Sequence, residues 1–277
     1  MTDSPDVAFV LGGGGLLGAS EVGQLLALGE AGITPDLVLG TSVGAINGAV
    51  VAAEPGPAAV QDLREMWTSL SRSAVFGGSP VQQLRMAART RTALHAPDPL
   101  RDLLTERLGD VLLEELPVPF QCVAASIERA EEHWFTTGPA VDAVLASCAV
   151  PGLFPPAVVD GEHFLDGGIV DSVPLGRAVA LGARSVYVLH VGRLERPLTA
   201  PTRPWEVAMV ALEVARRHRF LRDLAAVPGD VRVHVLPTGE ETAPLAVLRY
   251  RSTGAVERRI ESARAASAAY LAAQDLR

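Results

Sequence analysis

The fold of this 277-residue chain is decided within residues 7–53, which read VAFVLGGGGLLGASEVGQLLALGEAGITPDLVLGTSVGAINGAVVAA. Residues 7–11 form a short apolar run that leads into four glycines, as expected of a buried strand that ends in a tight loop. Residues 16–31 have helical spacing of their leucines, residues 36–40 form a second apolar strand, and residues 43–53 form a helix of small side chains. Strand and helix alternating at this spacing predict a parallel sheet with right-handed crossovers.

The rest of the chain continues the mixture of helices and strands. We expect helices at residues 58–70, 99–108, 139–147, 175–181, 205–224 and 254–273, and strands at residues 120–127, 133–135, 185–191 and 231–236. We find neither an internal repeat nor a linker of disordered composition. We therefore predict an α/β fold, a three-layer α/β/α sandwich with a mostly parallel central sheet. It would form a single domain over residues 1–277, with its motifs in a core of about 6–192 and a helix-strand-helix extension over about 203–277.

The composition excludes several classes of protein. There are 24 basic and 32 acidic residues, a net charge of −8, and every basic residue is an arginine. Without lysine, the chain cannot use a P-loop lysine, a Schiff base or a Ser-Lys nucleophile pair. The acidic balance argues against nucleic-acid binding. The two cysteines, Cys122 and Cys148, are too few for a disulfide framework or a zinc cluster. We expect neither a metal nor a cofactor.

The chain shows no targeting pattern. Its first residues include Asp3 and Asp6 rather than the positive charge of a secretory signal. The longest uncharged stretches, residues 37–53 and 143–159, are interrupted by glycines and prolines, so neither is typical of a membrane span. We expect a soluble, cytoplasmic protein.

The glycine loop has three possible uses. From Gly13 it reads G-x-G-x-x-G, after a strand and before a helix, which is the pattern of dinucleotide-binding proteins. That use requires an acid at the end of the second strand, but Asp36 stands at its start, about 13 Å away at ~3.3 Å per residue. The loop could instead be a plain turn. It could also present backbone N–H groups that stabilise an oxyanion during acyl transfer.

The next motif favours acyl transfer. Residues 40–44, Gly-Thr-Ser-Val-Gly, match G-x-S-x-G between a strand and a helix, which is typical of a nucleophile elbow. A serine at a helix start can also be an ordinary N-cap. Because the first two strands end at the same edge of the sheet, the glycine loop would lie beside Ser42.

A serine nucleophile needs a base, and the residues offer two kinds. Of the six histidines, His190, His218 and His234 follow Ser42 in the order that an α/β-hydrolase triad uses. In that fold, however, the nucleophile follows a central strand much later in the chain. The other candidate is Asp166, which is followed by two glycines and could alternatively just make a tight turn.

Four motifs together resemble the patatin-like phospholipase family over about residues 6–192. They are VLGGGGLLG at 10–18, GTSVG at 40–44, AVPGLFP at 149–155 and DGG at 166–168. The resemblance implies a three-layer α/β/α fold and a Ser-Asp dyad without histidine. Ser42 would be the nucleophile and Asp166 the base. The resemblance assigns further roles to glycines, namely an oxyanion hole at Gly13, Gly14 and Gly15 and motif support at Gly18, Gly40, Gly44, Gly167 and Gly168.

The function implied is hydrolysis of carboxylic esters of lipids through an acyl-Ser42 intermediate. The partner would be a lipid or another acyl ester, with possible peripheral contact at a membrane surface; the sequence does not specify the oligomeric state. The alternative is a catalytically silent module of the same fold that binds an anionic or acyl ligand. Leu17 keeps that alternative open, because the family usually has arginine or lysine there to brace the loop or attract an anionic head group. Ser172 likewise stands where asparagine is common.

Two other segments allow two interpretations each. Residues 72–98 carry four arginines among apolar residues and could be a lid over the site or a plain surface segment. Residues 216–222, RRHRFLR, are the densest basic run and could dock on an anionic membrane or form a solvated helix face.

Overall fold

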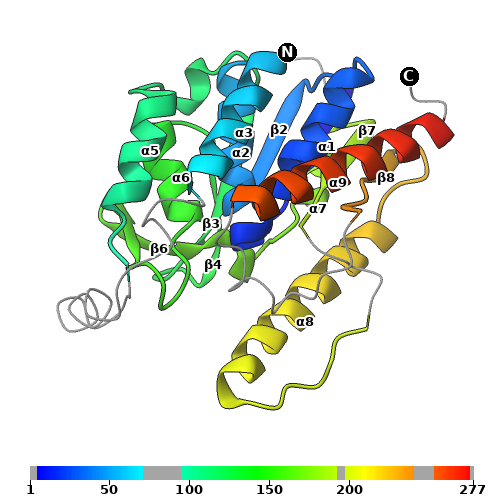
Figure 1. Cartoon of the computed structure of the whole chain (residues 1–277). Coiled ribbons are helices and arrows are strands. Elements are labelled where there is room, and N and C mark those ends of the chain that lie inside the picture. Colours follow the sequence, from blue (N-terminus) through cyan, green and yellow to red (C-terminus); the bar gives the residue numbers. More distant parts are fainter. Residues whose placement is uncertain (1–4, 71–94, 192–196, 240–252, 275–277) are drawn as a thin grey trace.

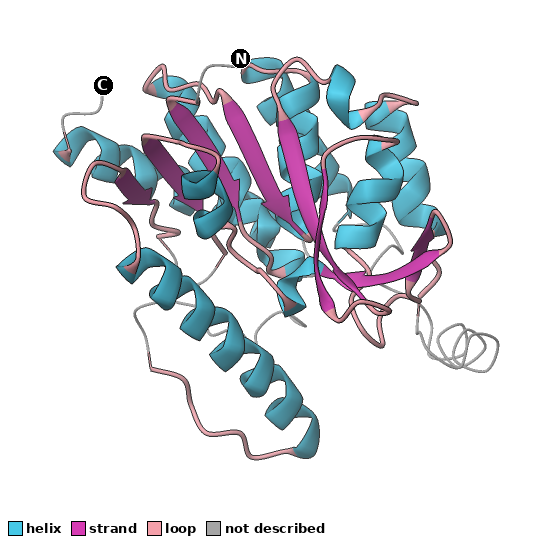
Figure 2. Cartoon of the chain, turned by 180° about the vertical axis from the view of Figure 1, so that it is seen from behind, coloured by secondary structure: helices cyan, strands magenta, loops and turns pink. Residues whose placement is uncertain are grey.

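The structure is a computed structural model that describes residues 5–70, 95–191, 197–239 and 253–274. It confirms the α/β fold, with a central sheet that has helices on both faces (Figures 1 and 2). The strand order is β5-β6-β3-β2-β1-β7-β8, and β4 pairs with β3. Most of the segment considered as a lid, residues 72–98, lies outside the described residues, which exclude residues 72–94.

Five neighbouring strands of the sheet are parallel. They are β3 (Phe120–Ser126), β2 (Leu37–Thr41), β1 (Val7–Leu11), β7 (Ser185–Leu189) and β8 (Arg232–Val235). The central strands β2 and β7 are buried along their whole length, which explains why they are apolar without alternation. These five strands correspond to strands predicted from the sequence, with ends that differ by one or two residues.

The sheet is completed at one edge by antiparallel strands. They are β4 (Glu131–Phe135), β6 (Glu162–Asp166) and β5 (Ala157–Val159). The sequence analysis predicted β4 in part and missed β5 and β6. Both are short and only partly buried, and β5 follows two prolines, so their composition is closer to that of a loop than to that of a central strand.

The helices agree with the predicted ones within about two residues at each end. They are α1 (Ala19–Glu30), α2 (Val43–Ala53), α3 (Pro57–Leu70), α5 (Asp98–Leu108), α6 (Ala140–Ser147), α7 (Leu175–Ala180), α8 (Pro204–Ala225) and α9 (Thr253–Ala273). Three short 3-10 helices are η1 (Gly15–Gly18), η2 (Leu113–Glu115) and η3 (Gly167–Ile169). The one clear difference is at η1, because the predicted helix at 16–31 begins as a 3-10 turn before α1.

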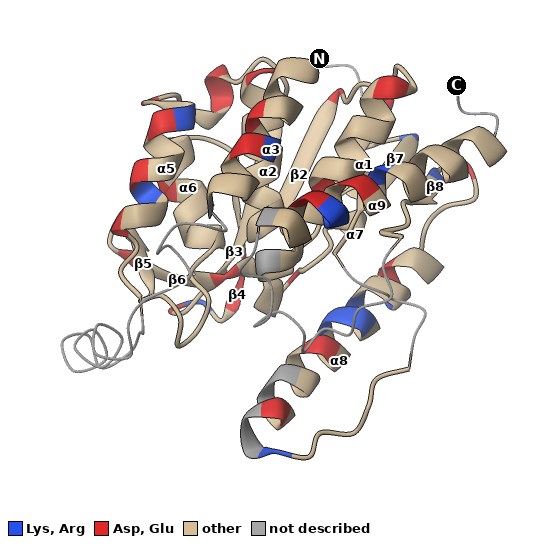
Figure 3. Ribbon diagram, in the orientation of Figure 1, with Lys and Arg blue, Asp and Glu red and all other residues tan. Residues whose placement is uncertain are grey.

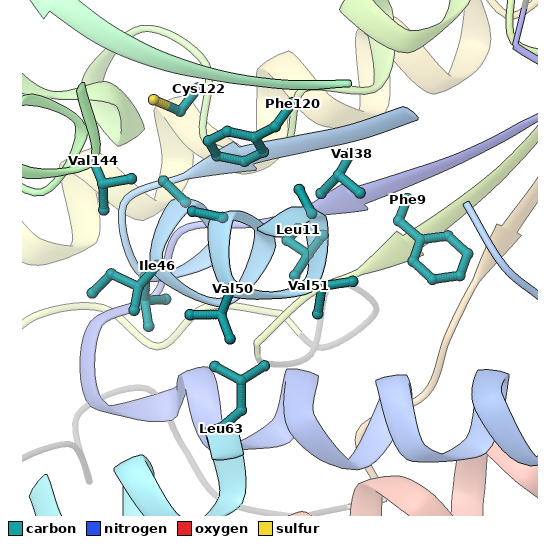
Figure 4. Packing of buried hydrophobic residues seen from close by; sticks show 14 of the residues in the cluster. Phe9, Leu11, Val38, Ile46, Val50, Val51, Leu63, Phe120, Cys122 and Val144 are labelled. Atoms are coloured by element: carbon teal, nitrogen blue, oxygen red, sulfur yellow. The ribbon is translucent and has the colours of Figure 1, made fainter. Parts of the chain in front are cut away.

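The larger hydrophobic core surrounds α2. Every residue of this helix from Val43 to Ala52 is buried, which explains its small side chains. In Figure 4, Val50 points away from the sheet toward Leu63 of α3. A smaller core on the other face of the sheet includes Phe220 of α8.

The C-terminal part of the chain adds to the same sheet. Strand β8 pairs with β7, and α9 packs along α1 (Figure 1). Among the described residues, every helix is too short or too polar to cross a bilayer.

Candidate active site

Ser42 occupies a strained turn between β2 and α2. Its backbone has φ 54° and ψ −122°, a conformation that costs a non-glycine residue ~1–3 kcal/mol. The turn requires glycine at both neighbouring positions of the motif, because the surrounding backbone leaves no room there for a side chain. A Cβ at Gly40 would lie 2.6 Å from the Cα of Ala45, and one at Gly44 would lie 2.3 Å from the Leu11 carbonyl oxygen. The G-x-S-x-G pattern therefore forms a turn with the backbone geometry expected of a nucleophile elbow.

Ser147, at the end of α6, holds this turn in place. The amide of Ser42 donates to Ser147 Oγ at 2.9 Å, and Ser147 Oγ donates to the Val123 carbonyl at 2.7 Å. All three groups are buried. The sequence analysis missed this role, for which the only signal is a hydroxyl at the end of a largely apolar helix.

The register of the sheet brings Asp166 to Ser42. Strands β2 and β6 lie on the same edge of β3, because β4 occupies the other edge along Cys122–Ser126. On that edge Thr41 pairs with Val123, and Asp166 pairs with the next residue, Ala124. The two strands therefore meet end to end, and the residue that follows Thr41 lies beside Asp166.

The carboxyl group of Asp166 is buried beside Ser42. Burial raises its pKa to about 6, while hydrogen bonding from the Ser42 side chain and the Gly168 amide lowers it. The Gly168 amide donates to Oδ1 at 2.7 Å. Within the described parts of the chain, the buried Oδ2 has no hydrogen bond of standard geometry. The contact with Ser42 is therefore a loose one, of the kind that tightens when substrate binds.

The glycine loop lies directly against Ser42. A Cβ at Gly13 would be 3.4 Å from the Cβ of Ser42. The amide of Gly13 donates to the Ser172 carbonyl at 2.8 Å, so it is already engaged. For the amides of Gly14 and Gly15, the described residues provide no acceptor. Of the three predicted oxyanion donors, these two have the N–H groups that a substrate could use.

A buried polar network supports the loop from behind. Asn47 donates to Glu21 Oε2 at 2.7 Å and to the Gly18 carbonyl at 3.1 Å, and Trp67 donates to Asn47 Oδ1 at 2.9 Å. Burial raises the pKa of Glu21, against the opposing effect of Asn47. The sequence analysis missed this network, although Asn47 is the one strongly polar residue of the apolar helix α2.

The basic run of residues 216–222 faces the site loops. Arg216 donates to the Gly13 carbonyl at 2.9 Å. Arg219 donates to the Val170 carbonyl at 2.6 Å and pairs with Asp171 at 3.2 Å. Figure 3 shows that α8 carries acidic residues as well, so the arginines of this run neutralise carboxylates of the protein itself.

Asp171 is a further carboxyl group with a raised pKa near the site, besides Asp166 and Glu21. Burial raises its pKa to about 7, against the lowering effect of Arg219. Its backbone carbonyl accepts a hydrogen bond from the Thr41 hydroxyl at 2.8 Å. The loop that follows Asp166 is thus tied both to β2 and to α8.

The other sequence candidates lie in different environments. His190 is buried and its pKa falls to about 4, first because of burial and then because of the nearby Arg216. His234 stacks on Tyr187 with ring centroids 4.8 Å apart, and His218 is exposed. Asp36 Oδ2 accepts a hydrogen bond from the Val7 amide at 2.9 Å, at the start of β1 and away from the glycine loop. Cys122 and Cys148 are buried free thiols.

Known sequences match the part of the chain that forms this site. The family described as patatin-like phospholipase matches residues 9–179. Lysophospholipase NTE1 of Mycosarcoma maydis is 32% identical over 198 residues, which cover 68% of this chain and 10% of the relative. An uncharacterized NTE family protein of Mycobacterium bovis is 30% identical over 182 residues, 66% of this chain and 48% of the relative. The chain thus spans less than half the length of either relative. Among solved structures, VipD of Legionella pneumophila has a TM-score of 0.49 at 15% identity, covering 98% of this chain and 67% of that chain.

Proposed function

The chain belongs to the patatin-like phospholipase family, and on this premise we propose that it is a serine acyl hydrolase that cleaves carboxylic esters of lipids. The observation that carries the proposal is the juxtaposition of Ser42, held in a strained turn, with the buried carboxyl group of Asp166. Similarity to a lysophospholipase supports a lipid substrate.

In the proposed first step, Ser42 Oγ attacks the carbonyl carbon of the ester while its proton passes to the Asp166 carboxylate. The carbonyl oxygen becomes an oxyanion, which the amides of Gly14 and Gly15 stabilise. The N-terminus of α2 adds a favourable dipole. When the C–O bond breaks, the leaving alkoxide takes the proton from Asp166, which releases an alcohol and leaves acyl-Ser42.

The second step repeats this chemistry with water. A water molecule gives its proton to Asp166 and attacks the acyl carbon, and the Ser42–acyl bond breaks. Ser42 recovers its proton from Asp166, and a carboxylic acid is released. Asp166 can serve in both steps because its raised pKa of about 6 is closer to neutrality than that of an exposed aspartate, which makes its carboxylate a stronger base at pH 7.

The proposal is tested with a fluorophosphonate probe and the intact mass of the protein. We expect a single adduct on the wild-type chain that is absent from Ser42→Ala. We expect Asp166→Asn to slow labelling by about 10²- to 10⁴-fold, the range of a positioned base. Hydrolysis of lysophospholipid and of a p-nitrophenyl ester, measured in parallel, then tests the substrate class.

Controls separate a failed site from an unfolded one. Circular dichroism should show each variant to be folded like the wild type, and His234→Ala should label at the wild-type rate. A folded wild-type chain that gives neither an adduct nor any ester hydrolysis would contradict the proposal. It would favour instead a silent module of this fold, for which binding of an acyl or anionic ligand is the observable.

A further inference from the structure

Helix α8 reaches the glycine loop through one arginine. Arg216 Nη1 donates to the carbonyl oxygen of Gly13 at 2.9 Å, although 203 residues separate them in the sequence. The Arg216 side chain is only 13% exposed. Gly13 lies within residues 9–179, the part of the chain that matches the family, whereas Arg216 lies beyond it.

The guanidinium of Arg216 is held in one orientation. Its Nε donates to Glu213 Oε2 at 2.8 Å and its Nη2 to Glu213 Oε1 at 3.0 Å, which is the two-point geometry of a strong arginine–carboxylate pair. Burial opposes ionisation of Glu213, but Arg216 and Arg217 outweigh it, and the pKa of Glu213 is lowered. With two nitrogens engaged, Nη1 remains to bind the loop.

The bonded carbonyl belongs to the peptide unit whose N–H is that of Gly14. A peptide unit is planar, so a donor fixed on its oxygen also fixes the direction of its N–H. Glycine lies on both sides of this peptide, and a peptide between two glycines can rotate with little steric resistance. The Gly13 amide is anchored on the Ser172 carbonyl at 2.8 Å, and Arg216 supplies the second anchor.

We propose that Arg216 is a positioning residue that orients the Gly14 N–H as an oxyanion donor. It supplies from α8 a brace for the glycine loop, which has the apolar Leu17 where a basic residue is usual in the family. This inference rests on the proposed serine acyl hydrolase function.

The test compares Arg216→Gln, Arg216→Lys and a control, Arg222→Gln. Arg222 lies on the same helix, its side chain is 63% exposed, and it pairs with the adjacent Asp223. Hydrolysis of p-nitrophenyl butyrate is measured for each, with active sites counted by complete fluorophosphonate labelling of Ser42. Thermal unfolding reports on stability.

We expect Arg216→Gln to lower kcat per labelled site by about 10- to 100-fold, because one misdirected donor costs up to the ~10²- to 10³-fold effect of removing it. KM should stay within about twofold, since the ground-state ester makes little use of the donor. Arg216→Lys should recover part of kcat, and Arg222→Gln should match the wild type.

The outcomes separate this inference from the function on which it rests. If Arg216→Gln has the wild-type kcat per labelled site, Arg216 does not position the donor and the inference fails alone. The inference also fails alone if Arg216→Gln lowers only the thermal stability and the fraction of protein that can be labelled. A merely structural role would produce that result. If the wild type is neither labelled nor active, the proposed function fails and this inference fails with it.

Discussion

Replacing Ser147 by alanine tests whether the strained turn at Ser42 depends on α6. The substitution removes the acceptor of the Ser42 amide, at 2.9 Å, and the donor to the Val123 carbonyl, at 2.7 Å. Both groups are buried, and leaving a buried group without a partner costs ~1–3 kcal/mol. The sum for the two groups is a loss of ~2–6 kcal/mol in the free energy of unfolding. A domain in the middle of the typical range of stability, about 10 kcal/mol, would remain folded.

The substitution should also affect the site. The positive φ of Ser42 is maintained by its surroundings, and the Ser147 hydroxyl is part of them. Without it, we expect the turn to relax and the rate of fluorophosphonate labelling at Ser42 to fall by at least about tenfold, since small misplacements of reacting groups cost up to ~10²-fold.

Urea unfolding followed by circular dichroism measures the stability, and intact mass against time measures the labelling. The matched control is Ser267→Ala, in α9, whose buried hydroxyl donates one hydrogen bond to the Pro237 carbonyl at 2.9 Å. It should cost ~1–3 kcal/mol and leave labelling unchanged. A Ser147→Ala variant that is within ~0.5 kcal/mol of the wild type, below the cost of one unpaired buried group, would refute the reasoning. So would one that is destabilised but labels at the wild-type rate.

Three further predictions concern the same region. The labelling rate of Ser42 should rise with pH and level off above about pH 6, because Asp166 accepts a proton only when it is ionised and its pKa is about 6. A labelling rate that is constant from pH 5 to pH 8 would contradict this prediction. Gly44→Ala should lower the free energy of unfolding in urea by more than ~2 kcal/mol, because the added Cβ would overlap a backbone carbonyl of β1. The control Gly29→Ala, in open space on α1, should be neutral or stabilising by up to ~1 kcal/mol. Equal effects of the two substitutions would contradict the packing argument. Asn47→Ala should lower the free energy of unfolding by ~2–4 kcal/mol, because it leaves the Trp67 N–H and a carboxyl oxygen of Glu21 without their buried partner. Unchanged stability in urea would show that the protein does not need this network.

The sequence by itself determined the elements that are stabilised locally. The helix at residues 43–53 is at the predicted residues, and the parallel strands differ only at their ends, because apolar runs between glycines carry a strong local signal. The same holds for the position of Ser42, since the need for glycine at Gly40 and Gly44 is written in the pentapeptide. The family resemblance named Asp166 but could not say where its strand lies.

Only the tertiary structure decided which distant groups meet. Strand β6 is short and partly exposed, so its register beside Ala124, which brings Asp166 to Ser42, has no local signal. Ser147 and Arg216 reach the site from α6 and α8, 105 and 203 residues from the groups that they bind. Residues 216–222 look like a free cationic surface in the sequence. Glu213 and Asp223 of the same helix neutralise part of that charge, but a one-dimensional pattern does not show that Asp171 and the carbonyls of Gly13 and Val170 also face these arginines. Pairing over such separations is set by the packing of the sheet and its helices, and this packing depends on the whole chain.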